Sequence, residues 1–274
     1  MKLIETKITV GATEPFSLLH ISDTHLTLAD DRDDARKLKL AEGRSKYFAH
    51  AEEYLAEAEK YAADNNMTIV HTGDLIDFVS EKNLDRAREF CKNNDVFFAA
   101  GNHEFSLYVG EAFEDADYRS QSLEHVQASF TNDIRFDVRK ICGVNIVAID
   151  NSYYLFEEYQ LERLKEVAAE GLPMILLMHN PLYAPDIYKE AMSRGSVAYL
   201  VGVPTELMSG YDDYRLRQQT ADEVTLETID YIKSEPLIKA IFTGHVHYDF
   251  ESDVTPHLKQ YATGIGSARV ISIE

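Results

Sequence analysis

The sequence predicts an α/β fold, and three observations support this prediction. Apolar runs with strand character alternate along the chain with segments whose apolar residues recur at helical spacing. Polar residues of the kinds that bind metals or transfer protons follow several of the predicted strands. No repeat, low-complexity tract or linker divides the 274 residues. Because α/β folds of about 250 residues are often single domains, we expect residues 1–274 to form one domain.

The N-terminal third of the chain alternates predicted strands with predicted helices. The first helix ends near Asn65 and has one apolar face at helical spacing. The second helix runs from Ser80, whose side chain suits an N-cap, to about Asn93. The three strands of this part comprise residues 16–21, 68–71 and 96–100.

The middle of the chain contains two further predicted helices and a pair of strands. Residues 134–138 and 144–149 are rich in β-forming residues and lie close enough to pair as a hairpin. A helix precedes them at about residues 120–130, and another begins near Glu157 and ends at a glycine. That second helix leads into a strand at residues 174–178.

Residues 181–220 show no clear periodicity and are rich in Tyr, Gly and Pro. A connection of this length without secondary structure is uncommon, so the segment is either a functional loop or contains short helices. Because it directly follows the motif residue His179, we expect a loop or cap on the substrate side. The remaining predicted elements are a helix at 221–234 and strands at 237–242, 261–263 and 268–273.

The chain is strongly acidic, with 47 Asp and Glu against 27 Lys and Arg and a formal net charge of −20. Nucleic acids and anionic membranes attract Lys and Arg, so this charge disfavours both as partners. No apolar leader occupies residues 1–16, and no stretch reaches the roughly 18 apolar residues of a membrane span. We therefore expect a cytoplasmic protein. Cys91 and Cys142 are isolated, which predicts neither a disulfide framework nor a thiolate zinc site.

Five short motifs of Asp, Asn and His each follow a predicted strand. Each motif alone is weak, because Asp and Asn are common in turns and a single His often has a structural role. In extended backbone, residues i and i+2 point the same way, so Asp23 and His25 can reach one ion. Strand ends at one edge of an α/β sheet converge, which brings the motifs together. They are Asp23-Thr24-His25, Gly73-Asp74-Leu75-Ile76-Asp77, Gly101-Asn102-His103-Glu104, His179 and Gly244-His245-Val246-His247.

Half of the ten histidines belong to these motifs. The last motif places two imidazoles on the same side of an expected extended segment, which a surface turn seldom needs. For the other histidines we expect structural roles, because they lie inside predicted strands or have no partner motif. They are His20, His50, His71, His125 and His257.

The order of these motifs resembles that of the calcineurin-like metallophosphoesterase family, over residues 23–247 and with no family motif missing. The resemblance implies a four-layer αββα sandwich of two mixed sheets flanked by helices. It implies that one divalent cation binds Asp23, His25, Asp74 and His247, and that a second binds Asp74, Asn102, His179 and His245. It further implies that Asn102 and His103 contact phosphate, that His103 donates a proton to the leaving oxygen, and that Asp77 orients His103.

The chemistry of these side chains agrees with that implication. Carboxylate, imidazole and amide ligands without sulfur suit Mn, Fe or Zn ions. One carboxylate between two such ions permits a bridging hydroxide, which is available near neutral pH and can attack phosphorus in line. The ions would stabilise the developing charge while His103 protonates the leaving group. No covalent nucleophile is required.

The expected substrate is a small phosphomonoester or phosphodiester, including nucleotides. Arg215 and Arg217, with Tyr183, Tyr188, Tyr211 and Tyr214, are available in residues 181–220 for phosphate and ring contacts. The alternative is that these six side chains only pack the segment onto the body of the protein.

Three other functions are weighed against this one. A nuclease of the same family is disfavoured by the acidity of the chain and by the lack of a basic stripe. A protein phosphatase is disfavoured because Phe78-Val79 stands where Ser/Thr phosphatases of the family have Arg-Gly. A non-catalytic binding scaffold is disfavoured because His103 and all seven implied ligands are present.

Overall fold

The computed structural model describes residues 1–105 and 116–274 and contains two mixed β-sheets. The first sheet has the strand order β1-β11-β2-β3-β4. In it β2, β3 and β4 are parallel, and β11 is antiparallel to β2. The bounds are β1 (Lys2–Ile8), β11 (Ser267–Ile273), β2 (Phe16–Ile21), β3 (Thr68–His71) and β4 (Val96–Phe98).

The second sheet has the order β5-β6-β7-β8-β10-β9. Its four central strands are parallel, and β5 and β9 pair antiparallel at the two edges. The predicted hairpin is confirmed, since Phe136 pairs with Ile149 and Ile141 with Val144. The bounds are β5 (Phe136–Ile141), β6 (Val144–Ile149), β7 (Met174–Leu177), β8 (Ile238–Thr243), β10 (Leu258–Ala262) and β9 (Phe250–Thr255).

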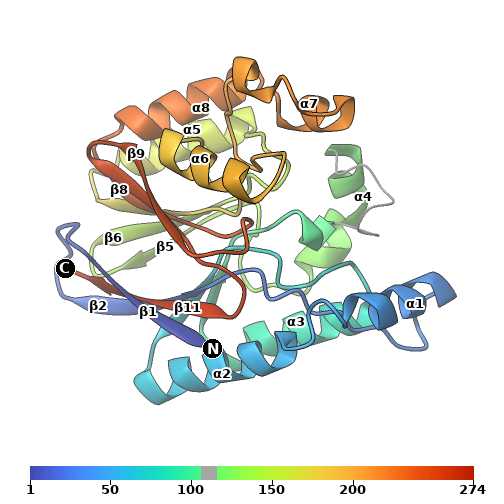
Figure 1. Ribbon diagram of the computed structural model, residues 1–274. Coiled ribbons are helices and arrows are strands. Elements are labelled where there is room, and N and C mark those ends of the chain that lie inside the picture. The colour runs from blue at the N-terminus through green and yellow to red at the C-terminus, as the bar shows by residue number, and fades with distance from the viewer. Residues whose placement is uncertain (106–115) are drawn as a thin grey trace.

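Helices cover the outer face of each sheet, so the molecule has four layers (Figure 1). Helices α2 (Ala51–Asn65) and α3 (Glu81–Asn93) pack on the first sheet, and α5 (Glu158–Ala168) and α8 (Glu223–Ser234) on the second. A fifth helix, α4 (Ala116–Gln127), packs against the same core as α2 and α3. The expected αββα sandwich is confirmed.

The two sheets face each other across an apolar core. Branched and aromatic side chains from both sheets meet there, where close packing and removal from water stabilise the fold. Burial of such side chains contributes on the order of 25 cal/mol per Å² of apolar surface. Representative members are Leu18, Val70 and Phe97 from the first sheet and Ile146, Leu177 and Phe242 from the second.

The sequence did not reveal helix α1 (Ala35–Arg44), which lies in a polar stretch. Leu40 is its only buried residue, so the apolar period that identifies a helix is almost absent. The helix is started instead by Asp34, whose side chain accepts a hydrogen bond from the Lys37 N–H.

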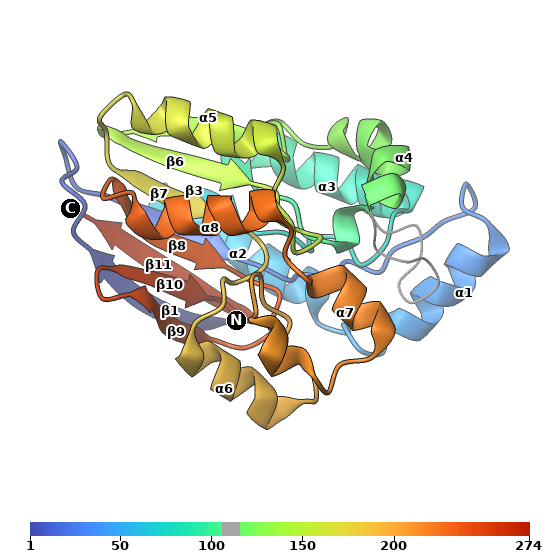
Figure 2. The same cartoon turned by 90° about the horizontal axis from the view of Figure 1, so that it is seen from above.

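Residues 181–220 contain short helices, which resolves the two alternatives left open for this segment. Helix α6 (Pro185–Arg194), the 3₁₀ helix η2 (Thr205–Met208) and α7 (Asp213–Gln219) form a satellite cluster with its own small apolar core around Ile187 and Met208. Figures 1 and 2 show α7 and α1 beyond the same end of the sheets, one on the side of each sheet.

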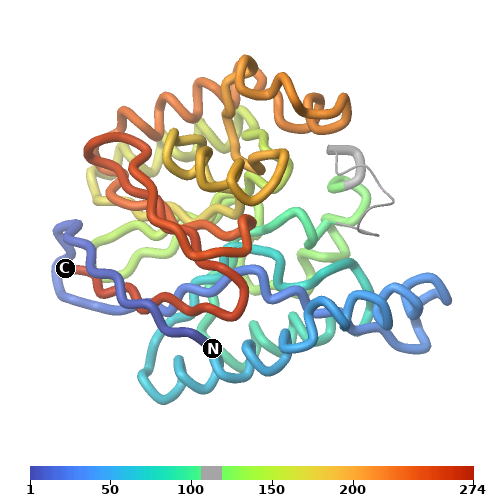
Figure 3. Tube along the Cα trace, in the orientation of Figure 1, coloured from blue at the N-terminus to red at the C-terminus, as the bar shows by residue number. Residues whose placement is uncertain are grey.

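Figure 3 shows the same arrangement in the chain trace, with residues 181–220 in yellow to orange on the side of the second sheet and α1 in blue on the side of the first sheet. In the described part of the chain, no helix is long and apolar enough to cross a bilayer.

Candidate metal centre

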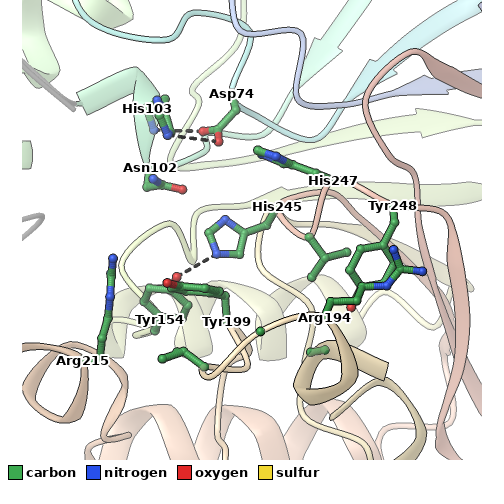
Figure 4. A pocket seen from close by; sticks show the side chains of 14 residues that line it. Asp74, Asn102, His103, Tyr154, Arg194, Tyr199, Arg215, His245, His247 and Tyr248 are labelled. Atoms are coloured by element: carbon green, nitrogen blue, oxygen red, sulfur yellow. Dashed lines mark hydrogen bonds and ion pairs between the residues drawn. The ribbon is translucent and has the colours of Figure 1, made fainter. Parts of the chain in front are cut away.

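The motif residues gather where β2, β3, β4, β7 and β8 end. Three groups of side chains each place their ligand atoms within 4.8 Å of one another, and two of these groups share Asp74. The third joins His25 to Asp77 and His103. The first group is Asp23, His25, Asp74 and His247, and the second group is Asp74, His179 and His245. Asp74 belongs to both, so its carboxylate lies between them. Asn102 lines the same pocket as Asp74 (Figure 4).

The backbone of these motifs is not extended, which corrects the expectation for Asp23-x-His25 and His245-x-His247. Positive φ angles occur at Asp23 (54°), His25 (53°), Asp74 (56°), His245 (68°) and His247 (61°). Non-glycine residues rarely adopt this left-handed conformation, and it concentrates at functional sites. The backbone therefore turns sharply at each of these residues. It is not an extended segment in which residues i and i+2 point the same way.

The glycines of the motifs allow the strand-end loops to approach one another closely. A Cβ atom at Gly101 would lie 2.3 Å from Asp74 Oδ1. One at Gly244 would lie 2.3 Å from Asp23 Oδ2. Because real Cβ atoms cannot approach so closely, only glycine fits at these two positions.

Hydrogen bonds outside the groups fix the orientation of two imidazoles. His179 Nδ1 donates to the Thr72 carbonyl at 2.7 Å, and His25 Nδ1 donates to Asp77 Oδ1 at 3.0 Å. In a neutral ring the Nε2 atom then carries a lone pair, which is the form that binds a metal. These Nε2 atoms face further imidazole nitrogens at 3.1 Å, those of His245 and His247. Such convergence of lone pairs and carboxylates fits divalent cations.

The charges within the site also favour cation binding. Burial would raise the pKa of Asp74, but His179 and His103 keep that pKa well below its usual value. Burial would lower the pKa of His179, but Asp74 and Asp23 raise it to about 9. The carboxylates are therefore ionised, and in the metal-free chain a proton is held at His179. A cation that binds the same atoms displaces that proton.

Glu104 holds the loops after β3 and β4 together. Its buried carboxylate accepts hydrogen bonds from the N–H groups of Asp74 at 2.7 Å, Leu75 at 2.8 Å and Gly101 at 2.8 Å. Burial, with the nearby charge of Asp74, raises the pKa of Glu104 to about 7. Glu104 stands in the third motif, but its spacing alone did not indicate this supporting role.

His103 and Asp77 lie beside the two groups that share Asp74. His103 Nδ1 donates to the main-chain carbonyl of Asp77 at 2.6 Å, while the Asp77 carboxylate is 3.4 Å from the same nitrogen. The imidazole closest to the Asp77 carboxylate is instead that of His25, whose Nδ1 atom lies 3.0 Å from Asp77 Oδ1. Asp77 thus contacts His103 mainly through its backbone and His25 through its side chain.

A pocket of about 410 Å³ opens over the two groups (Figure 4). Arg215 lines it, and its guanidinium lies 5.0 Å from the Tyr199 ring and 4.9 Å from the Tyr214 ring. Arg217 is exposed and does not line the pocket. The walls also include Tyr154, Arg194, Val197, Tyr199 and Tyr248.

The tyrosines at the pocket are not those expected from the sequence. Tyr183, Tyr188, Tyr211 and Tyr214 do not line it, and the Tyr211 hydroxyl accepts from the Ala198 N–H at 2.8 Å within the satellite cluster. Tyr154 does line it, and its hydroxyl is 2.7 Å from His245 Nε2. Tyr154 follows strand β6, so the rule that located the five motifs also applied to this position.

The remaining histidines are outside both groups. His20 and His71 are buried and bond to threonine hydroxyls, His20 Nε2 to Thr72 at 2.8 Å and His71 Nε2 to Thr24 at 3.1 Å. At the surface His50 pairs with a Glu three residues later, and His125 with a Glu on α3. These contacts agree with structural roles.

Sequence comparison identifies the family. The model of the calcineurin-like phosphoesterase family matches residues 16–249. The chain belongs to the calcineurin-like phosphoesterase family. It is therefore a metal-dependent phosphoesterase, a hydrolase of phosphate esters, in a family that depends on two metal ions. No curated protein matches the phosphoesterase in sequence.

Several solved structures are similar to the phosphoesterase, and the first of those named here shares its fold. A dimetal phosphatase from Danio rerio is 12% identical, with a TM-score of 0.52 over 92% of this chain and 88% of that one. A phosphopantetheinyl hydrolase from Mycobacterium tuberculosis is 11% identical, with a TM-score of 0.44 over 91% and 90% of the two chains. A 5′-nucleotidase from Candida albicans is 12% identical, with a TM-score of 0.42 over 91% of this chain and 46% of that one.

Proposed function

We propose that the phosphoesterase hydrolyses a phosphomonoester or phosphodiester of a small organic molecule or nucleotide, using two divalent cations. One observation carries the proposal: two ligand groups share Asp74 at the base of a single pocket. The first cation would be held by the first group. The second would be held by the second group together with Asn102. Oxygen and nitrogen ligands without sulfur suit Mn, Fe or Zn.

The chain's own residues complete the reaction. When bound, the two cations supply an activated water and stabilise charge on the phosphate oxygens. His103 donates its Nδ1 proton to the Asp77 carbonyl, so a proton for the leaving oxygen must come from Nε2. This nitrogen lies 3.9 Å from Asp74 Oδ2, beside the shared carboxylate. This position supports our proposal that His103 acts as the general acid and that Asn102, which lines the same pocket, contacts phosphate.

The substrate side of the pocket is formed by residues 181–220, which we propose act as a cap on a single domain of residues 1–274. Arg215 has no carboxylate within 4.0 Å among the described residues, whereas Arg194 pairs with Glu190 at 2.6 Å. In a chain of net charge −20, a pocket-lining guanidinium without a carboxylate partner favours an anionic group. The acidity of the rest of the chain supports a small substrate over nucleic-acid or membrane partners. A cytoplasmic location is part of the same proposal.

Metal loading tests the proposed function directly. The purified phosphoesterase, stripped with a chelator and reloaded with Mn²⁺, should bind about two ions per chain and hydrolyse nitrophenyl phosphate or bis-nitrophenyl phosphate. Elemental analysis and nitrophenol release measure the two quantities. The stripped protein provides the baseline. Absence of bound metal, or hydrolysis of neither ester above that baseline, would exclude the proposal.

The two arginines of α7 offer a matched pair for testing the substrate contact. Arg215→Ala should raise KM about 10- to 100-fold with kcat little changed, because a charge-assisted hydrogen bond contributes about 1.5–3 kcal/mol. Arg217→Ala removes the same charge at an exposed position outside the pocket and should change KM less than about twofold. KM is measured for the best substrate among nitrophenyl phosphate and nucleoside 5′-phosphates. Equal KM values for the two variants would remove Arg215 from the substrate site.

A further inference from the structure

The end of helix α1 reaches the metal centre through Arg44. Arg44 Nε lies 2.6 Å from Asp77 Oδ2, and Nη2 lies 2.8 Å from Asp77 Oδ1. The guanidinium therefore binds both carboxylate oxygens, a fork that fixes the plane of the carboxylate as well as neutralising it. The Asp77 side chain is fully buried, whereas the Arg44 side chain is 25% exposed at the surface.

Asp77 connects this arginine to a member of the first group. Its Oδ1 atom accepts the Nδ1–H of His25 at 3.0 Å, and it is the same oxygen that Arg44 Nη2 contacts. The His25 Nε2 atom, on the other side of the ring, lies 3.1 Å from His247 Nε2. Any rotation of the Asp77 carboxylate would thus turn the lone pair that His25 directs into the first group.

Phe48, four residues after Arg44, holds the same imidazole by its face. The Phe48 and His25 rings are stacked, with centroids 4.2 Å apart and planes inclined by 11°. The Arg44 guanidinium carbon lies 5.0 Å from the Phe48 ring centroid. Residues 44–48 therefore hold the face of His25 directly, through Phe48, and its edge indirectly, through the contact of Arg44 with Asp77.

We propose that Arg44, through Asp77 and with Phe48, is a positioning residue that sets the cation affinity of the first group. This proposal rests on the proposed two-cation function. A simpler role makes the opposite prediction, because a positive charge that acted only by its field would repel a cation. Removal of that charge would then tighten cation binding. The sign of the change in affinity separates the two roles.

The experiment measures Mn²⁺ binding to the metal-free full chain by titration calorimetry, with the groups separated by substitution. In a His245→Ala background the second group is incomplete, so binding reports the first group. In a His25→Ala background binding reports the second group. Arg44→Ala should weaken Mn²⁺ binding about 10- to 100-fold in the first background, the range for loss of a partner that orients a ligand. In the second background it should change binding less than about threefold, since Arg44 acts through His25.

Two further variants control for charge and for folding. Arg32 also pairs with carboxylates, those of Asp30 and Asp85. Arg32→Ala removes the same charge as Arg44→Ala and should leave Mn²⁺ affinity unchanged. In an Asp77→Asn chain, Arg44→Ala should cause little additional loss, because the two substitutions break one connection. Circular dichroism of each metal-free variant confirms that the fold is retained.

The outcomes are distinct. Equal losses in the two backgrounds, unchanged affinity, or tighter binding in the His245→Ala background would each overturn the role of Arg44. Absence of Mn²⁺ binding by the unsubstituted chain would overturn the proposed function together with this inference.

Discussion

Asp74→Asn should remove both cations and lower kcat/KM on the order of 10⁴-fold or more. Charge stabilisation alone accounts for on the order of 10²–10³-fold in such sites, and water activation is lost with it. The reason is the shared position of Asp74. Its Oδ2 atom lies 3.1 Å from His179 Nε2 in the second group and 3.7 Å from His25 Nε2 in the first. Asparagine has nearly the same shape but no charge, so the fold should survive.

Elemental analysis after gel filtration, combined with ester hydrolysis, measures this effect. Asp33→Asn is the matched control, because Asp33 is also buried and its carboxylate accepts the Glu81 N–H at 3.1 Å outside either group. The control should retain both metal and activity. An Asp74→Asn chain that still binds two Mn²⁺ ions would show that the carboxylate is not shared.

The sequence predicted the metal-ligand residues better than the residues that form the walls of the pocket. The ligand motifs follow strands, and strand ends must converge at the edge of a sheet whatever the details of the loops. Much of the pocket wall comes from residues 181–220, where α6 and α7 are short and α6 is bonded to strand β9 through Asp186 and Ser252. Their apolar period is too brief to identify a helix.

Contacts between polar residues far apart in the sequence were equally hidden. Arg44 meets Asp77 from a helix with one buried residue, and no local pattern indicates which carboxylate a surface arginine reaches. The left-handed backbone at His245 and His247 was also not foreseen, because propensity predicts against it for non-glycine residues. Packing between distant parts of the chain imposes both the Arg44–Asp77 contact and these backbone angles, and local sequence patterns do not reveal such packing.

His103→Asn should lower kcat by an amount that depends on the leaving group. Asparagine can still donate to the Asp77 carbonyl, as His103 Nδ1 does at 2.6 Å, but it has no counterpart of Nε2. An alkoxide must be protonated as it leaves, so hydrolysis of an alkyl phosphate should slow about 10²–10⁴-fold. Nitrophenolate leaves without a proton, so hydrolysis of nitrophenyl phosphate should slow only about tenfold, through loss of a phosphate contact.

Steady-state kinetics with the two esters at saturating Mn²⁺ separate the roles of His103. Metal content should stay at two ions per chain, because His103 lies outside both the first and the second group. A loss of equal size for both esters would assign His103 to phosphate binding instead of proton transfer. A loss that is much larger for the alkyl ester than for the nitrophenyl ester places the proton on Nε2, since the backbone of Asp77 occupies the other nitrogen. The dependence on leaving group therefore tests the orientation of one imidazole, which a single rate constant cannot do.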